Sequence, residues 1–187
     1  AFAFGNILID QNIKPQTTDS WEIGTNLVFL RNRINLDVAY FNARDYNQLE
    51  RVPLSEGSGY KFFQTNGNVY KRKGIEFTLS ADVVKKTDFR WSTQVNFSQY
   101  RRYLAEIYKG KDMTNEYVRE GERTDKLTTS GYERSPDGQL VLKNGYPVNN
   151  TSPIPIFMGY SNPDWTYGFS HNFSYKNFSL SLLFDGR

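Results

Sequence analysis

The side chains that could do acid–base chemistry are few and widely spaced. Glu76 and Asp82 share one face of a predicted strand, His171 is the single histidine, and the chain has no cysteine. Six residues of extended chain separate the two carboxylates by about 20 Å, whereas a glycosidase pair needs roughly 5–10 Å. We therefore expect Glu76 and Asp82 to be solvated charges, with no catalytic residue, metal site or cofactor in the chain.

A second group of chemically active side chains lies in one long, irregular segment. It combines tyrosines, whose rings stack on sugar or peptide faces, with arginines, which pair with carboxylates. The alternative is that these side chains only pack the loop against a neighbouring part of the protein. The candidates for contact with a bound ligand are Tyr117, Arg119, Arg123 and Tyr132.

The elements that must position these residues are strands, because apolar side chains recur at every second position. Clear runs of alternation fall at 20–29, 34–40, 75–83, 89–98, 165–174 and 178–184, and the second is expected to continue as extended chain to about Glu50. His171 has the same parity as Phe169 and Phe173, so we expect an amphipathic residue near an interface and no catalytic base. Residues 135–142 predict a tight turn within a small hairpin.

The connections between these strands alternate in length. Short turns are predicted at 31–33, 85–88 and 175–177, and long loops at about 51–72 and 105–162. Aromatic side chains gather beside the short turns. Outer-membrane β-barrels have short periplasmic turns, long extracellular loops and aromatic girdles at both interfaces. The pattern therefore predicts an all-β, antiparallel up-and-down transmembrane barrel with strands at about 20–50, 73–103 and 164–187.

Composition agrees with this interpretation. Phe, Tyr and Trp make up 16% of the 187 residues, and aromatic residues favour strands and membrane interfaces. No run of about 18 apolar residues predicts a transmembrane helix. The formal net charge is +3 without a basic block, so nucleic-acid binding is not indicated. The alternative is a soluble carbohydrate-binding β-sandwich, in which Leu79 and Phe97 would face a protein core.

Short motifs resemble one family in order along nearly the whole chain. They are KPQTTDSWEIG at 14–24, NRINLDVAYFN at 32–42, NGNV at 66–69, KGIEFTL at 73–79, FRW at 89–91, NFS at 96–98, NPDW at 162–165, KNFSLS at 176–181 and DGR at 185–187. Together they resemble the barrel of SusC/RagA-type TonB-dependent outer-membrane transporters. The differences fall in the long loops, where members of this family vary.

The resemblance implies a 22-stranded barrel of which residues 1–187 are a C-terminal piece, with the plug domain and TonB box absent. It implies import of an oligosaccharide or peptide across the outer membrane of a Gram-negative cell, powered by TonB. It further implies a SusD-like surface lipoprotein as partner, outer-membrane lipid around the barrel, and no enzymatic activity.

Overall fold

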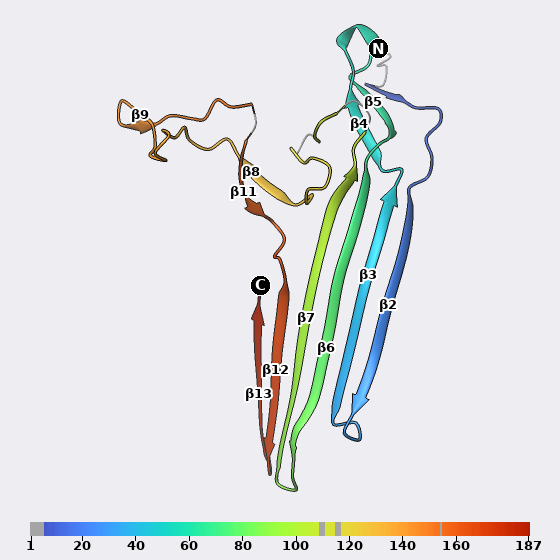
Figure 1. Cartoon of the computed structure of the whole chain (residues 1–187), viewed down its shortest axis with the longest axis vertical. Helices are drawn as coiled ribbons and strands as arrows, with labels where there is room; N and C mark the ends of the chain where they lie inside the picture. The colour runs from blue at the N-terminus through green and yellow to red at the C-terminus, as the bar shows by residue number, and fades with distance from the viewer. Residues whose placement is uncertain (1–5, 109–110, 115–116, 154) are drawn as a thin grey trace, which may run out of the picture.

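The computed structural model describes residues 6–108, 111–114, 117–153 and 155–187. One antiparallel sheet of six strands dominates it, in the spatial order β13-β12-β7-β6-β3-β2. Figure 1 shows a tall wall with short turns at one end and loops at the other. Its strands are β2 (Thr17–Phe29), β3 (Ile34–Tyr46), β6 (Val69–Lys85), β7 (Phe89–Glu106), β12 (Thr166–Tyr175) and β13 (Phe178–Gly186).

The sheet has two chemically different faces, as the alternation predicts. Strand pairing aligns the apolar residues into rows that cross the sheet, which together we call the apolar face. One row joins Val38, Phe77, Phe97 and Tyr167, and the rings of Phe77 and Phe97 stack at 5.4 Å. The residues between these rows form the polar face.

Short turns close the sheet at one end, where the sequence predicts them. Leu30, Arg31 and Asn32 all have positive φ, and the amide of Arg33 donates to the Phe29 carbonyl over 3.1 Å. Aromatic side chains crowd this end, where the rings of Trp91 and Phe173 stack at 5.6 Å. The predicted girdle beside the short turns is therefore present.

The apolar face has no protein cover among the described residues. Among the named strands, these six contact only their hydrogen-bonded neighbours in the sheet, and Leu182 and Phe184 are 39% and 56% exposed. The four buried hydrophobic residues, Ala43, Val69, Leu104 and Val118, do not form a core beneath this face. A soluble sandwich would bury its apolar face under a second sheet, so the sandwich alternative is not supported. No described helix is long and apolar enough to cross a membrane.

The far end of the wall holds more structure than the sequence predicts. The second strand ends at Tyr46, short of Glu50, because Asn47 adopts a positive φ of 56°. The predicted loop at 51–72 instead contributes to a small sheet that also includes residues 7–9, and β6 begins at Val69. That sheet has the order β1-β5-β4, with β1 (Ile7–Ile9), β4 (Leu49–Pro53) and β5 (Phe62–Asn66), beside a 3-10 turn at Glu56–Ser58.

The predicted loop at 105–162 also contains short strands. They are β8 (Lys126–Thr129), β9 (Leu142–Lys143), β10 (Tyr146–Pro147) and β11 (Ile156–Tyr160), paired as β11-β8 and β10-β9. The predicted hairpin within it is confirmed, because Arg134 pairs with Leu140 and the Ser135 amide donates to the Gln139 carbonyl over 2.9 Å.

Two asparagines of the NGN motif join the small sheet to the wall. The Asn66 amide group donates to the Lys14 carbonyl over 3.0 Å and accepts from the Lys14 amide over 2.6 Å. Buried Asn68 donates to Glu50 and accepts from the amide of Tyr108, each over 2.8 Å. Buried polar groups are stable only when bonded in this way, which gives the motif a structural role.

The two faces predict opposite responses to a buried charge. In the intact protein that carries this sheet, Leu79→Arg should cost about 2–4 kcal/mol of folding free energy, because an arginine near the bilayer midplane loses its hydration. Thr78→Arg, one position away on the polar face, should be much milder. Folding into liposomes, followed by gel mobility and denaturant titration, measures both. Equal losses for the two variants would contradict the assignment of faces.

Candidate functional site

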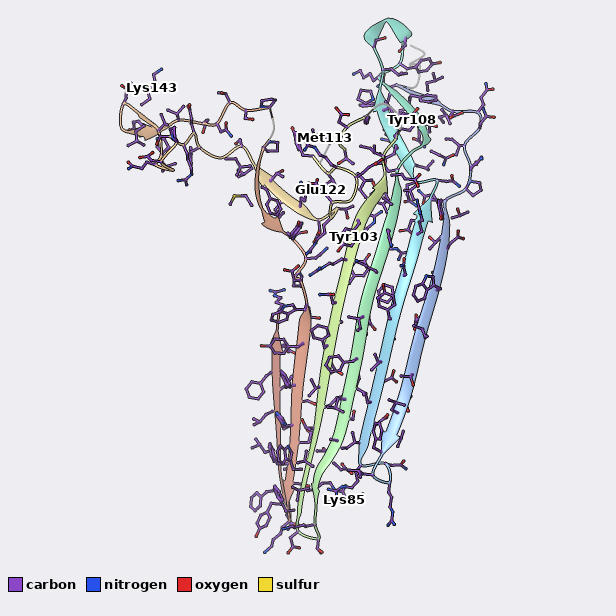
Figure 2. The ribbon with its side chains drawn as sticks, viewed as in Figure 1. Lys85, Tyr103, Tyr108, Met113, Glu122 and Lys143 are labelled. Atoms are coloured by element: carbon purple, nitrogen blue, oxygen red, sulfur yellow. The ribbon has the colours of Figure 1, made fainter. Side chains whose placement is uncertain are left out.

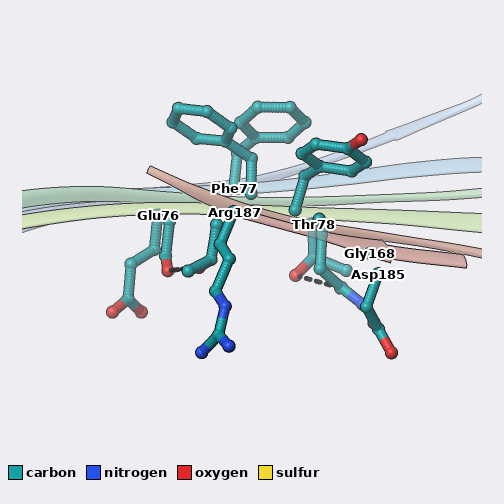
Figure 3. Close-up of a pocket in the computed structure, with 12 residues that line it drawn as sticks. Glu76, Phe77, Thr78, Gly168, Asp185 and Arg187 are labelled. Carbon is teal, nitrogen blue, oxygen red and sulfur yellow. Dashed lines mark hydrogen bonds between the residues drawn. The ribbon is translucent and has the colours of Figure 1, made fainter. Parts of the chain in front are cut away.

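The candidate site is the polar face together with the loops above it. A shallow hollow crosses β6, β7 and β12 on this face, lined by Glu76, Thr78, Asn96, Ser98, Thr166, Gly168, Asp185 and Arg187, among others. Figure 3 shows Glu76 and Asp185 projecting from one side of the sheet and the Phe77 ring from the other.

Small polar side chains in the hollow bond to one another across strands. The Thr78 hydroxyl donates to Asn96 over 3.1 Å, and the hydroxyls of Ser98 and Thr166 lie 2.7 Å apart. Such a surface offers hydroxyl and amide groups for hydrogen bonding. Glu76 and Asp82 both lie on β6, six residues apart, so the structure does not bring them together as a catalytic pair.

No metal-binding cluster of His, Cys, Asp and Glu occurs in the described part of the chain. His171 lies on the apolar face, where its Nδ1 is 2.9 Å from the Thr93 hydroxyl, and its ring contacts Trp91 and Phe184. This placement agrees with an amphipathic residue among aromatic rings.

Above the hollow, the polar face carries aromatic and cationic side chains that the sequence reasoning missed. Phe41 crosses Gly74 and stacks on Tyr100 at 6.3 Å. A Cβ at Gly74 would lie 2.5 Å from the Phe41 ring, so only glycine permits this arrangement. The Arg102 guanidinium lies 3.9 Å above the Tyr70 ring. Strand parity with Glu76 was the signal that could have placed these residues on this face.

Tyr100 is the open member of this group, with 43% of its surface exposed. Exposed aromatic rings next to cations can stack on sugars or peptide bonds. Beside it, Arg72 is bound by Asp45, whose two oxygens accept bonds of 2.7 and 2.8 Å. Burial raises the pKa of Asp45, but hydrogen bonds from Arg72 and Thr18 and the charges of Arg72 and Arg102 together hold that pKa below its ordinary value.

Of the predicted ligand contacts, Arg123 is an internal anchor. Its side chain is 7% exposed and bonds to both oxygens of Asp125 over 3.0 and 2.7 Å, to Asp164, and to the Asn162 carbonyl over 3.1 Å. The Tyr160 ring lies 3.8 Å from the guanidinium. Arg123 therefore ties the long loop to the segment that enters β12.

The anchored segment also covers an edge of the wall. β12 pairs with β7 only as far as Ser98, so the residues of β7 beyond Ser98 lack that neighbouring strand. Residues 121–124 fill the gap, because Leu104 donates to the Glu122 carbonyl over 3.0 Å and accepts from the Gly121 amide over 2.8 Å. Unpaired strand edges invite wrong pairing, so this segment protects β7.

The other predicted contacts remain accessible. Tyr117 has a positive φ of 60° and is 38% exposed, while exposed Arg119 uses its amide to bind Glu122 over 2.8 Å. Both lie in the segment that Arg123 anchors. Tyr132, 50% exposed, lies in the part of the loop that carries β9 and reaches away from the wall in Figure 1. The structure therefore groups Tyr117, Arg119 and Arg123 but not Tyr132.

A tall, two-faced antiparallel sheet with turns below and loops above defines the wall of a transmembrane β-barrel. A family model described as "TonB dependent receptor-like, beta-barrel" matches residues 2–185. The chain belongs to this family.

Two curated relatives are similar over nearly the whole chain. TonB-dependent receptor P3 of Formosa agariphila is 26% identical over 96% of this chain and 21% of its own length. TonB-dependent receptor SusC of Bacteroides thetaiotaomicron is 24% identical over 92% of this chain and 19% of its own length. The chain thus spans about a fifth of these relatives, and the likeness supports a SusC/RagA-type barrel.

Solved structures share the fold. The RagAB peptide importer in its open-open state aligns with 90% of this chain, which corresponds to 20% of the importer chain. The TM-score is 0.70 and the sequence identity is 18%. The RagAB peptide transporter aligns with 91% of this chain, or 21% of the transporter chain, with a TM-score of 0.66 and 18% sequence identity.

The Arg123 anchor predicts a local loss of protection. Arg123→Gln should raise hydrogen exchange of residues 118–126 and 160–164, because breaking a buried ion pair costs about 3–5 kcal/mol. Arg119→Gln, an exposed arginine in the same segment, should change exchange little. Hydrogen exchange with mass spectrometry on the intact protein compares the two. Identical protection patterns would contradict the anchor.

The anchor should also resist mild acid. The Arg123 hydrogen bond is the largest influence that holds the pKa of Asp125 below its ordinary 3.8. A carboxylate with a lowered pKa stabilises the fold above its unfolded pKa and loses this effect as pH falls through the folded value. Protection of residues 118–126, corrected for intrinsic rates, should therefore be equal at pH 7 and pH 5. A clear loss at pH 5 would show that another group holds the loop.

Proposed function

We propose that this sheet is part of the wall of an outer-membrane importer that carries an oligosaccharide or a peptide into the cell. The observation that carries the proposal is the exposed apolar face on one side and the bonded, hydroxyl- and amide-rich face on the other. Apolar rings would contact lipid, and the polar face would line the lumen. Membership of the TonB-dependent receptor-like family also supports a role in import.

In this proposal the cargo enters from the loop end and meets the aromatic and cationic group before the hollow. Tyr100 and the loop residues Tyr117, Arg119 and Tyr132 supply rings and one guanidinium for stacking and hydrogen bonding. Both cargo classes have faces that suit such contacts. The solved neighbour RagAB is a peptide importer by description, which supports a peptide as one of the two cargo classes.

The proposal also includes two partners. Energy would come from TonB, acting on a plug domain elsewhere in the intact protein, and a SusD-like lipoprotein would cover the loop end. Similarity to SusC and the shared fold with RagAB support both. No covalent chemistry is assigned to this chain, and its relatives carry the names of receptors and transporters.

Uptake by cells tests the proposal. Cells expressing the intact protein are given a labelled tryptic digest of casein or a labelled hydrolysate of plant polysaccharide. One of the two should enter, and entry should stop without TonB or without the transporter. Entry of neither probe, or entry that does not depend on TonB, would contradict an import role of this kind.

A variant on the polar face then tests the path. Tyr100→Ala should weaken binding of the imported probe about tenfold, as expected for loss of a central aromatic contact. Tyr175→Ala removes a tyrosine of similar exposure from the other end of the same sheet, and should leave binding unchanged. Calorimetry on the purified intact protein measures both. Equal weakening would show a general effect on folding instead of a cargo contact.

A further inference from the structure

Four cationic side chains share the apolar side of the sheet near its loop end, level with Trp21 and Tyr103. Strand pairing places Arg44 directly opposite Lys71 and Lys73 directly opposite Arg101. The two pairs lie in neighbouring rows on the same face, since Lys71 and Lys73 are two positions apart on one strand. Like charges directly opposite one another destabilise a sheet. Two such pairs in neighbouring rows concentrate positive charge on this part of the face, and an anion bound there would relieve the repulsion.

The carboxylates nearby pair with the two arginines of this cluster but leave its two lysines without an ion pair among the described residues. Glu106 forms an ion pair with Arg44. Asp164 lies 3.3 Å from Arg101 and also forms an ion pair with Arg123. Asp19 lies opposite Arg44 on β2 but forms no ion pair with it. Lys71 and Lys73 are exposed and form no ion pair with any described carboxylate.

Unused donors mark the same place. The Nε atoms of Arg44 and Arg101 are buried and have no hydrogen-bond partner in the described structure. A buried donor without a partner is unfavourable, so the carboxylates leave these two arginines incompletely bonded. Each arginine thus gives its outer nitrogen to a carboxylate and keeps a second donor unbonded beside a lysine.

The height of the cluster fits the edge of a membrane. Trp21 shares the row of Lys73 and packs on Tyr40 at 5.5 Å, and the rows below are apolar. Lys73 lies 5.0 Å above the Tyr103 ring, and Figure 2 shows Tyr103 high on β7, at the opposite end of the sheet from Lys85. Tryptophan and tyrosine concentrate at the headgroup level of membrane proteins.

A shallow hollow at this height could receive a headgroup. It is lined by Asp19, Ser20, Trp21, Asn42, Arg44 and Lys71. Arginine forks and lysine ammonium groups bind phosphate oxygens well. The cluster lies on the opposite face from Tyr100 and the polar hollow, so its ligand is not the cargo.

We propose that Arg44, Lys71, Lys73 and Arg101 bind the phosphate groups of a lipid headgroup in the outer leaflet. The ligand is a phosphorylated lipid whose acyl chains lie along the apolar rows below Trp21. The inference rests on the membrane location within the proposed function. It adds a binding site on the outside of the barrel, where the lipid would also screen the two like-charge pairs.

Lipid titration of the purified intact protein in neutral detergent tests this site. The probes are bisphosphorylated lipid A, the same lipid without its phosphates, and inorganic phosphate, with binding measured by native mass spectrometry. Lipid A should bind and the dephosphorylated lipid should bind at least about tenfold more weakly, because each basic residue contributes about 1 kcal/mol to anionic-lipid binding. Equal binding of the two lipids would overturn the proposal, as would inorganic phosphate competing fully at lipid concentrations.

Matched variants locate the site. Lys71→Gln with Lys73→Gln should weaken lipid A binding about 30-fold, the effect of two basic residues at the headgroup level. Lys86→Gln with Lys176→Gln removes two exposed lysines from the short turns at the other end, and should change it little. Equal weakening by both double variants would overturn the assignment. Probe uptake by cells is measured separately, so a failed import role and a failed lipid site are distinguishable.

Discussion

The hydrogen-bond ladder of the wall is the constraint on which the rest of the structure depends. Hydrocarbon offers no partner to a backbone amide or carbonyl, so each must be bonded within the protein. Pairing of β3 with β6 is unbroken from Ile34 to Asp45, and that of β12 with β7 from Thr166 to Tyr175. The β6–β7 ladder shifts register at two places, both near its ends. Irregularity is thus kept away from the rows that would lie deepest in the bilayer.

That constraint explains which parts of the fold the sequence predicts. Where one face meets an apolar phase and the other meets water, alternation is strict, and rows such as Leu36, Leu79 and Val95 follow directly from it. The same logic places His171 among aromatic rings and Glu76 on the polar face. Prediction fails at β5 and most of β4, because these short strands lack a regular alternation of apolar and polar side chains and were taken for a loop.

The candidate site divides in the same way. The face of Tyr100 follows from parity, but the place of Arg123 does not. Its burial depends on Asp125, Asn162 and Asp164, which meet only after the loop has folded back along β7. An arginine in a tyrosine-rich loop looks the same in the sequence whether its side chain binds cargo or anchors the loop. Only the contacts between segments that are distant in the sequence distinguish the two roles. The structure shows Arg123 enclosed by such contacts, whereas Tyr117 and Arg119 nearby are exposed.

The upper part of the wall shows that one strand must satisfy two environments in succession. Along β6, the apolar face presents Leu79, Phe77 and Ile75 and then Lys73 and Lys71. It therefore changes from apolar to charged side chains between two consecutive residues on that face. The polar side changes in the opposite sense, from Thr78 to the Phe41–Tyr100 stack over Gly74. A strand that leaves the membrane no longer needs an apolar exterior, so the upper wall carries cationic side chains on its outer face and an aromatic stack on its inner face.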